Sequence, residues 1–188
     1  MNEVIKALLE RRSIRKFEST PVDEETLQTI LKAGIYAPSA RNSQAWQVTA
    51  ITNPQIIEKV NQAMKTASQT PGFDKYAAFV KQEGYSINFK TAPVFLIVSV
   101  DPSASFAPPE EGALVLGNIF LAAHSLGLGT CWVNQLGPIC DEPGFRAILT
   151  ELGVPAAYRI IGCAALGHPA GNHPSAPARK EGAINIVR

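Results

Sequence analysis

Four positively charged side chains and a hydroxyl lie within six residues near the start of the chain, in Arg11-Arg12-Ser13-Ile14-Arg15-Lys16-Phe17. Guanidinium groups bind phosphate through forked, charge-assisted hydrogen bonds, and a hydroxyl adds a further donor. The cluster therefore predicts a phosphate-binding site. A solvated helix end is the alternative interpretation, because cations also stabilise the negative, C-terminal pole of a helix.

A second polar segment begins at a proline and carries closely spaced hydroxyl and amide groups, in Pro38-Ser39-Ala40-Arg41-Asn42-Ser43-Gln44-Ala45-Trp46. Amide side chains both donate and accept hydrogen bonds. This combination suits recognition of the polar edge of a heteroaromatic ring. An ordinary loop is the alternative.

Glycines introduce a third candidate segment, which runs from Gly127 through Thr130-Cys131-Trp132-Val133-Asn134-Gln135. Glycine lets the backbone approach a flat ring closely. The segment follows a helical pattern and enters a strand, whereas a dinucleotide-binding glycine motif follows a strand and opens a helix. A fourth candidate is Arg179-Lys180, in an arm with so little apolar content that we expect it to be ordered only by docking.

Other kinds of site find no support in the sequence. The three cysteines and three histidines show no ligand spacing, so no metal site is expected. No G-x-S-x-G, Walker A or H-E-x-x-H motif occurs, although a triad built on Ser39 stays open. A formal net charge of +1 argues against a nucleic-acid partner. The lack of a signal-peptide pattern or disulfide framework predicts a cytoplasmic protein that does not associate with membranes.

The elements that would position these segments follow from hydrophobic periodicity. Strands are expected at Trp46–Ile51, Val94–Val100, Gly129–Val133 and Tyr158–Leu166. Helices are expected at Asn2–Arg12 and at Glu110–Leu126, with a weaker helical turn around Tyr76, Phe79 and Val80. Three more are expected to begin at capping residues, Asp23, Asn53 and Asp141. The helix at Glu110–Leu126 is apolar nearly all round and should be the central buried one. These elements predict one layered α+β or α/β domain over residues 1–188.

The order and spacing of the candidate segments resemble the nitroreductase family of FMN-dependent oxidoreductases. RRSIRKF, APSARNSQAWQ, GLGTCWVNQL and IIGCAALGHPA carry the resemblance, together with the downstream arginine. It implies an α+β fold with a central, mostly antiparallel sheet of four to five strands flanked by helices. It also implies an obligate homodimer with FMN bound at the subunit interface, and a dimer core formed by the apolar helix.

The resemblance also implies which residues contact the flavin. The phosphate, the ribityl chain and one ring edge would be held by Arg11, Arg12, Ser13 and Arg15. The partner subunit would contribute Pro38, Ser39, Ala40, Asn42 and Gln44. Backbone donors along the ring would come from Trp132, Val133, Asn134 and Gln135, with Asn88 as a further polar contact, and Arg179 and Lys180 would return to the phosphate.

The activity implied is transfer of a hydride from NAD(P)H through flavin N5 to a small acceptor, such as a nitroaromatic or a quinone, by a ping-pong mechanism. No side chain is named as catalytic, because the cofactor carries the chemistry. Many family members have glycines or an acidic residue at the positions of Asn134 and Gln135, so these side chains are expected to restrict bulky acceptors. The alternatives left open are a dimeric flavin-binding or sensor protein without catalysis, a flavin-cleaving or dehalogenating relative, and a hydrolase or transferase without flavin. The sequence does not choose the acceptor, nor between NADH and NADPH.

Overall fold

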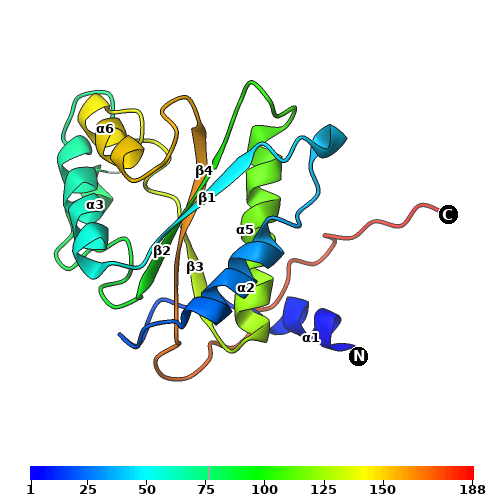
Figure 1. Cartoon of the computed structure of the whole chain (residues 1–188). Helices are drawn as coiled ribbons and strands as arrows, with labels where there is room; N and C mark the ends of the chain where they lie inside the picture. The colour runs from blue at the N-terminus through cyan, green and yellow to red at the C-terminus, as the bar shows by residue number, and fades with distance from the viewer. Residues whose placement is uncertain (76) are drawn as a thin grey trace.

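The computed structural model describes residues 1–75 and 77–188, and its centre is a four-stranded sheet in the order β1-β2-β4-β3 (Figure 1). The strands are β1 (Trp46–Ile51), β2 (Val94–Val100), β3 (Gly129–Val133) and β4 (Arg159–Gly167). All three pairings within this sheet are antiparallel. A single parallel bridge between Ser13 and Thr130 adds part of a fifth strand beside β3. The prediction of a mostly antiparallel sheet is confirmed.

Helices cover both faces of the sheet. They are α1 (Glu3–Glu10), α2 (Glu24–Gly34), α3 (Pro54–Ala67), α4 (Ala77–Val80), α5 (Pro108–Ser125) and α6 (Pro143–Glu151). Figure 1 shows α2 and α5 on one face and α3 and α6 on the other. The predicted helical turn included Tyr76, which lies outside the described residues.

Strand β2 shows how the sequence pattern produces this arrangement. Successive side chains of a strand point to opposite faces. Phe95 and Ile97 pack in the cluster under α3 and α6, while Leu96 and Val98 pack under α2 and α5. All seven residues of β2 are buried, as the unbroken apolar run predicts.

Most helix starts follow local capping rules. Asp23 Oδ1 accepts a hydrogen bond from Thr26 N at 2.8 Å, and Asn53 Oδ1 accepts one from Gln55 N at 2.9 Å, as predicted. The prediction that Asp141 caps the last helix is wrong. Glu142 is the cap and accepts from Phe145 N at 2.8 Å, because Pro143 occupies the first helical position, where its missing N–H costs nothing.

Two helices leave apolar side chains on the surface. The inner side of α5 is fully buried, but its Leu114 is 46% exposed and Leu126, the residue that follows the helix, is 48% exposed. Helix α1 has no buried residue, and its Leu8 and Leu9 are 55% and 58% exposed. Among the described residues, we find no helix with the length and hydrophobicity needed to cross a bilayer.

Candidate functional site

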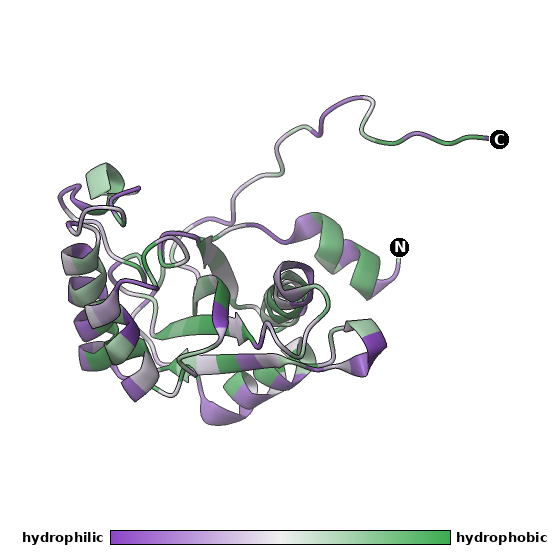
Figure 2. Ribbon diagram, turned by 90° about the horizontal axis from the view of Figure 1, so that it is seen from above, coloured by the Kyte–Doolittle hydropathy of each residue, from purple (hydrophilic) through white to green (hydrophobic). Residues whose placement is uncertain are grey.

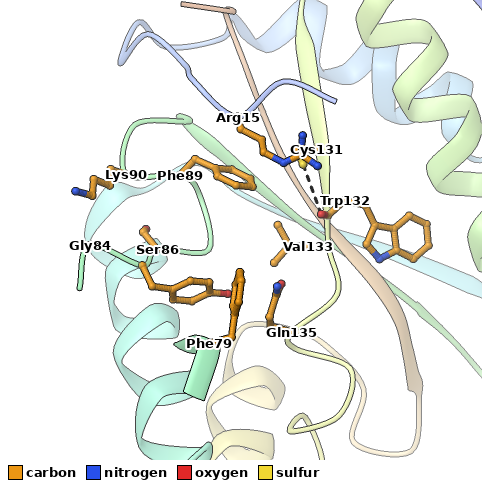
Figure 3. Close-up of a pocket in the computed structure, with 11 residues that line it drawn as sticks. Arg15, Phe79, Gly84, Ser86, Phe89, Lys90, Cys131, Trp132, Val133 and Gln135 are labelled. Atoms are coloured by element: carbon orange, nitrogen blue, oxygen red, sulfur yellow. Dashed lines mark hydrogen bonds between the residues drawn. The ribbon is translucent and has the colours of Figure 1, made fainter. Parts of the chain in front are cut away.

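A cleft of about 400 Å³ opens beside β3, between the basic N-terminal segment and the chain that leads into β2 (Figure 3). Its lining combines two cations, three aromatic rings and the end of β3. The lining residues are Arg15, Phe79, Gly84, Tyr85, Ser86, Phe89, Lys90, Cys131, Trp132, Val133 and Gln135. A volume of this size is typical of sites for small molecules and cofactors.

The basic segment reaches the cleft because it runs directly along β3. Ile14 N donates to Thr130 O at 2.9 Å. The close approach requires glycine at position 129, since a Cβ there would lie 2.7 Å from Ile14 Cβ. At the far end of the segment, Glu18 N donates to His168 O at 2.9 Å. The segment is thereby fixed at both ends, and Arg15 points into the cleft towards Cys131 (Figure 3).

Several predicted residues meet around Cys131. Burial raises the pKa of its thiol, while the charges of Arg15 and Arg11 and a hydrogen bond with Ser13 act in the opposite direction. Burial has the largest effect, so the thiol stays protonated. The guanidinium groups of Arg15 and Arg11 make its surroundings positively charged. The structure therefore brings Arg11, Ser13 and Arg15 together, as the sequence predicted.

Arg12 lies differently from its neighbours. Its Nη1 donates to Leu9 O at 2.8 Å and to Arg11 O at 2.6 Å, so it folds back onto the end of α1. Its Nε is buried and has no hydrogen-bond partner among the described residues. Burial and then the charge of His173 lower the pKa of His124, at the end of α5, and the nearby charges of Arg11 and Arg12 lower it further against an opposing effect of Glu10.

Strand β3 presents its backbone, and not its tryptophan, to the cleft. The indole of Trp132 points away from the cavity and packs edge-on against Phe120 on α5, with ring centroids 6.3 Å apart (Figure 3). Glycine at position 162 of β4 makes room for the ring, because a Cβ there would lie 2.8 Å from Trp132 Cε2. Val133 points to the opposite face and joins the cluster under α3 and α6.

The loop that leads into β2 contributes a cation that sequence reasoning missed. Lys90 lines the cleft, and both it and Phe89 have positive φ, 72° and 52°. Asn88, which was predicted as a contact, holds this loop in shape instead of lining the cleft. Its Nδ2 donates to Ala92 O at 2.9 Å, and its Oδ1 accepts from Ser86 Oγ at 2.6 Å. The Lys90 side chain lies at the rim of the cleft, where a Cβ on Gly84 would be 2.9 Å from its Nζ, and no local sequence pattern predicts this placement (Figure 3).

The segment from Pro38 to Gln44 does not reach the cleft within one chain. It lies beside the start of α5, where Ala40 N donates to Glu111 at 2.9 Å. His124, near Arg11 and Arg12, lies at the other end of the same helix. At 1.5 Å per residue, these two positions on α5 are about 20 Å apart.

The C-terminal arm also leaves the cleft. Residues 171–188 contain no helix or strand, and the arm projects from the body of the chain (Figures 1 and 2). Arg179 and Lys180 are exposed on it. Within one subunit, the structure therefore gathers Arg11, Ser13, Arg15 and the end of β3, and leaves the Pro38–Gln44 segment and the arm elsewhere.

The fold is an α+β arrangement of one antiparallel sheet with helices on both faces, and the candidate site is a cation-lined cleft beside β3. The chain belongs to the nitroreductase family, whose family model matches residues 8–168. This confirms the family predicted from the sequence.

Solved structures share the fold over the whole chain. A nitroreductase with bound FMN from Bacteroides fragilis is 38% identical, with a TM-score of 0.92 and full coverage of both chains. A nitroreductase with bound FMN from Desulfitobacterium hafniense is 26% identical, with a TM-score of 0.84 and full coverage of both chains. Among curated proteins, an FMN reductase [NAD(P)H] from Bacillus subtilis is 32% identical over 98% of this chain and 73% of its own length.

Proposed function

We propose that the chain is an FMN-dependent oxidoreductase that uses NAD(P)H to reduce a small acceptor, with residues 1–188 forming one FMN-binding domain. The observation that carries the proposal is the cleft itself, in which Arg15 points towards the end of β3, aromatic rings form the opposite wall and Lys90 lies at the rim. The FMN bound to the two solved relatives and the name of the B. subtilis reductase support it.

The lining of the cleft fits FMN. Phe79 and Phe89 offer flat apolar surface to a ring system. Tyr85 adds a third ring to this wall, with its hydroxyl buried towards the core. Two cations suit an anionic phosphate and a ring that gains negative charge on reduction.

Each group of residues would contact a different part of the bound FMN. Arg11, Arg12 and Ser13 would bind the phosphate and ribityl chain, and Arg12 would turn from the carbonyls of Leu9 and Arg11 to do so. Arg15 and Lys90 would hold the ring edge, while the backbone from Trp132 to Gln135 would line the ring near N5. Asn88 would act by shaping the loop that carries Lys90. When bound, FMN supplies the hydride-accepting and hydride-donating chemistry.

The position of the Pro38–Gln44 segment supports a homodimer. A two-fold axis perpendicular to α5 would pack the helix antiparallel against its copy, so that the start of one helix meets the end of the other. The Pro38, Ser39, Ala40, Asn42 and Gln44 positions of one subunit would then reach the basic cluster of its partner. The arm with Arg179 and Lys180 would cross onto the same partner.

Exposed apolar surface marks where the second subunit would pack. A groove of about 410 Å³ between α1, α2 and α5 is lined by Val4, Ala7, Tyr36, Leu121 and Ala122, among others. Figure 2 shows apolar residues along α1 beside this groove. Contiguous exposed apolar surface of this kind is typical of protein–protein interfaces.

The acceptor would be small, such as a nitroaromatic or a quinone, and would use the same ring face as the nicotinamide in turn. The side chains of Asn134 and Gln135 are expected to limit its size, since Gln135 lines the cleft. Two substrates that alternate at one face produce ping-pong kinetics.

The test is the visible spectrum of the purified protein before and after anaerobic addition of NADPH or NADH. We expect a yellow protein that bleaches with one of the two donors and recovers its colour when a quinone or nitroaromatic is added. A protein that stays colourless after FMN is supplied would refute flavin binding. A yellow protein that neither donor bleaches would instead be a non-catalytic flavin-binding protein.

A further inference from the structure

A buried carboxylate at the start of α5 is hydrogen-bonded to two loops and not to its own helix. Glu111 is 2% exposed, although glutamate is among the residues least often buried. Its Oε1 accepts from Ala40 N at 2.9 Å, and its Oε2 accepts from Ser105 Oγ at 2.8 Å and from Ser43 Oγ at 3.3 Å. Glu111 therefore joins the Ser39–Gln44 loop to the loop that precedes α5.

A second contact joins the same two loops. The guanidinium of Arg41 lies 4.7 Å from the ring centroid of Phe106. The Phe106 loop is itself fixed, since Ala107 N donates to Ser105 Oγ at 3.1 Å. Both partners of this cation–π contact are exposed, so we assign the main anchoring to the buried Glu111.

The anchored loop has a backbone that L-residues rarely adopt. Arg41, Asn42 and Gln44 have φ values of 53°, 54° and 46°. Such conformations persist only where the surroundings determine them. Inside the loop, Gln44 N donates to Ser39 Oγ at 3.0 Å and Gln44 Nε2 donates to Asn42 Oδ1 at 2.9 Å. Two backbone bonds, from Asn42 N to Ser39 O and from Ser43 N to Ala40 O, both at 3.1 Å, also close the loop on itself. Glu111 ties the loop's polar groups to the rest of the fold, through Ala40 N and Ser43 Oγ.

We propose that Glu111 is a positioning residue that pre-forms the Ser39–Gln44 loop for the flavin bound by the partner subunit. The inference rests on the proposed function, because it takes that loop as a cofactor contact. Glu111 itself would not touch the flavin. A loop already held in its binding conformation loses less conformational freedom on binding, and this strengthens the affinity.

The first experiment needs no cofactor. Trypsin cleaves after Arg41, so the rate of cleavage of apo protein at this bond reports how firmly the loop is held. We expect Glu111→Ala to raise that rate at least tenfold. Glu110→Ala is the matched control, because it removes the same charge from the same helical turn at an exposed position, and its rate should equal that of the wild type. An unchanged rate in Glu111→Ala would overturn the anchoring role.

A milder variant covers the case in which Glu111→Ala does not fold. Glu111→Gln keeps an oxygen that can accept from Ala40 N but loses one acceptor for the serine hydroxyls. We expect its cleavage rate after Arg41 to be at least threefold above that of the wild type, with an unchanged circular dichroism spectrum. A rate equal to that of the wild type would contradict the proposal.

The second experiment connects the loop to the cofactor. We expect the FMN dissociation constant, measured by quenching of flavin fluorescence, to rise at least tenfold in Glu111→Ala and to stay unchanged in Glu110→Ala. The KM for the nicotinamide donor should not move, because Glu111 does not contact that face. Faster cleavage with an unchanged FMN affinity would show that the loop does not serve the cofactor. If the wild type binds no FMN, the proposed function fails, and the cleavage rates still decide the anchoring role.

Discussion

Replacing Gly162 with alanine should displace the indole of Trp132. The new Cβ would overlap Trp132 Cζ2, and it would lie 2.8 Å from Trp132 Cε2 and 2.9 Å from Leu116 Cδ1. The ring cannot move freely, because it already packs against Phe120. Overpacking of this kind costs about 1–3 kcal/mol, and part of it is offset by the roughly 0.5–1 kcal/mol that alanine gains over glycine within a strand.

A net cost of about 1–2 kcal/mol corresponds to a fall in Tm of roughly 2–8 °C for a chain of this size. The assay is thermal unfolding of apo protein at fixed concentration, followed by circular dichroism. A smaller ring at position 132 should relieve the overlap, so Gly162→Ala and Trp132→Phe should be coupled by about 1 kcal/mol or more in a double-mutant cycle.

The same variants test where the indole points. Trp132→Phe should change the FMN dissociation constant less than threefold, because the side chain lies on the far side of the sheet from the cleft. A Gly162→Ala protein as stable as the wild type, or strictly additive effects, would refute the packing of Trp132 against Gly162. A large loss of FMN affinity in Trp132→Phe would instead place the ring in the cleft.

Two further variants test the surroundings of the site. Burial, and then the charge of His173, lower the pKa of His124, with smaller contributions from Arg11 and Arg12 and an opposing one from Glu10. The unfolded chain therefore takes up the proton more readily than the folded chain, so the free energy of unfolding falls as the pH drops below about 7. His124→Gln should flatten the dependence of Tm on pH between about 7 and 5. An unchanged slope would contradict this reasoning. Leu8→Glu on α1 should convert the dimer to a monomer, measured by light scattering, and should weaken FMN binding. Gln55→Glu, which makes the same charge change on α3, should do neither. If Leu8→Glu protein stays dimeric, α1 is not part of the interface.

Patterns that depend only on neighbouring residues predicted the strands and several of the helix starts. The run Val94–Val100 indicated a strand covered on both faces, and every one of its residues is buried. Asp23 and Asn53 cap their helices as expected, because capping depends on residues only two or three positions apart. The same reasoning failed at Asp141, where a proline one position further on moved the helix start to Glu142.

Features that depend on distant contacts could not be predicted. Glu111 and Ala40 are 71 residues apart, so no sequence window contains the bond between them. The loop that brings Lys90 to the rim of the cleft contains two consecutive left-handed residues, which favour glycine and are not expected at Phe89 and Lys90. The alternation of β3 predicts that Cys131 and Trp132 lie on opposite faces, but the room that Gly162 leaves for the indole depends on the pairing of β3 with β4.

The central claim is that each flavin site combines the basic cluster of one subunit with the Ser39–Gln44 loop of the other. The most direct test is a mixed dimer, in which one subunit carries Arg15→Ala and the other carries Asn42→Ala together with Gln44→Ala. The two variant homodimers should both bind FMN weakly. The mixed dimer should bind one FMN per dimer with wild-type affinity, because one of its two sites contains no substitution. A mixed dimer that binds FMN as weakly as the homodimers would show that the cluster and the loop serve the same subunit, and would contradict the account.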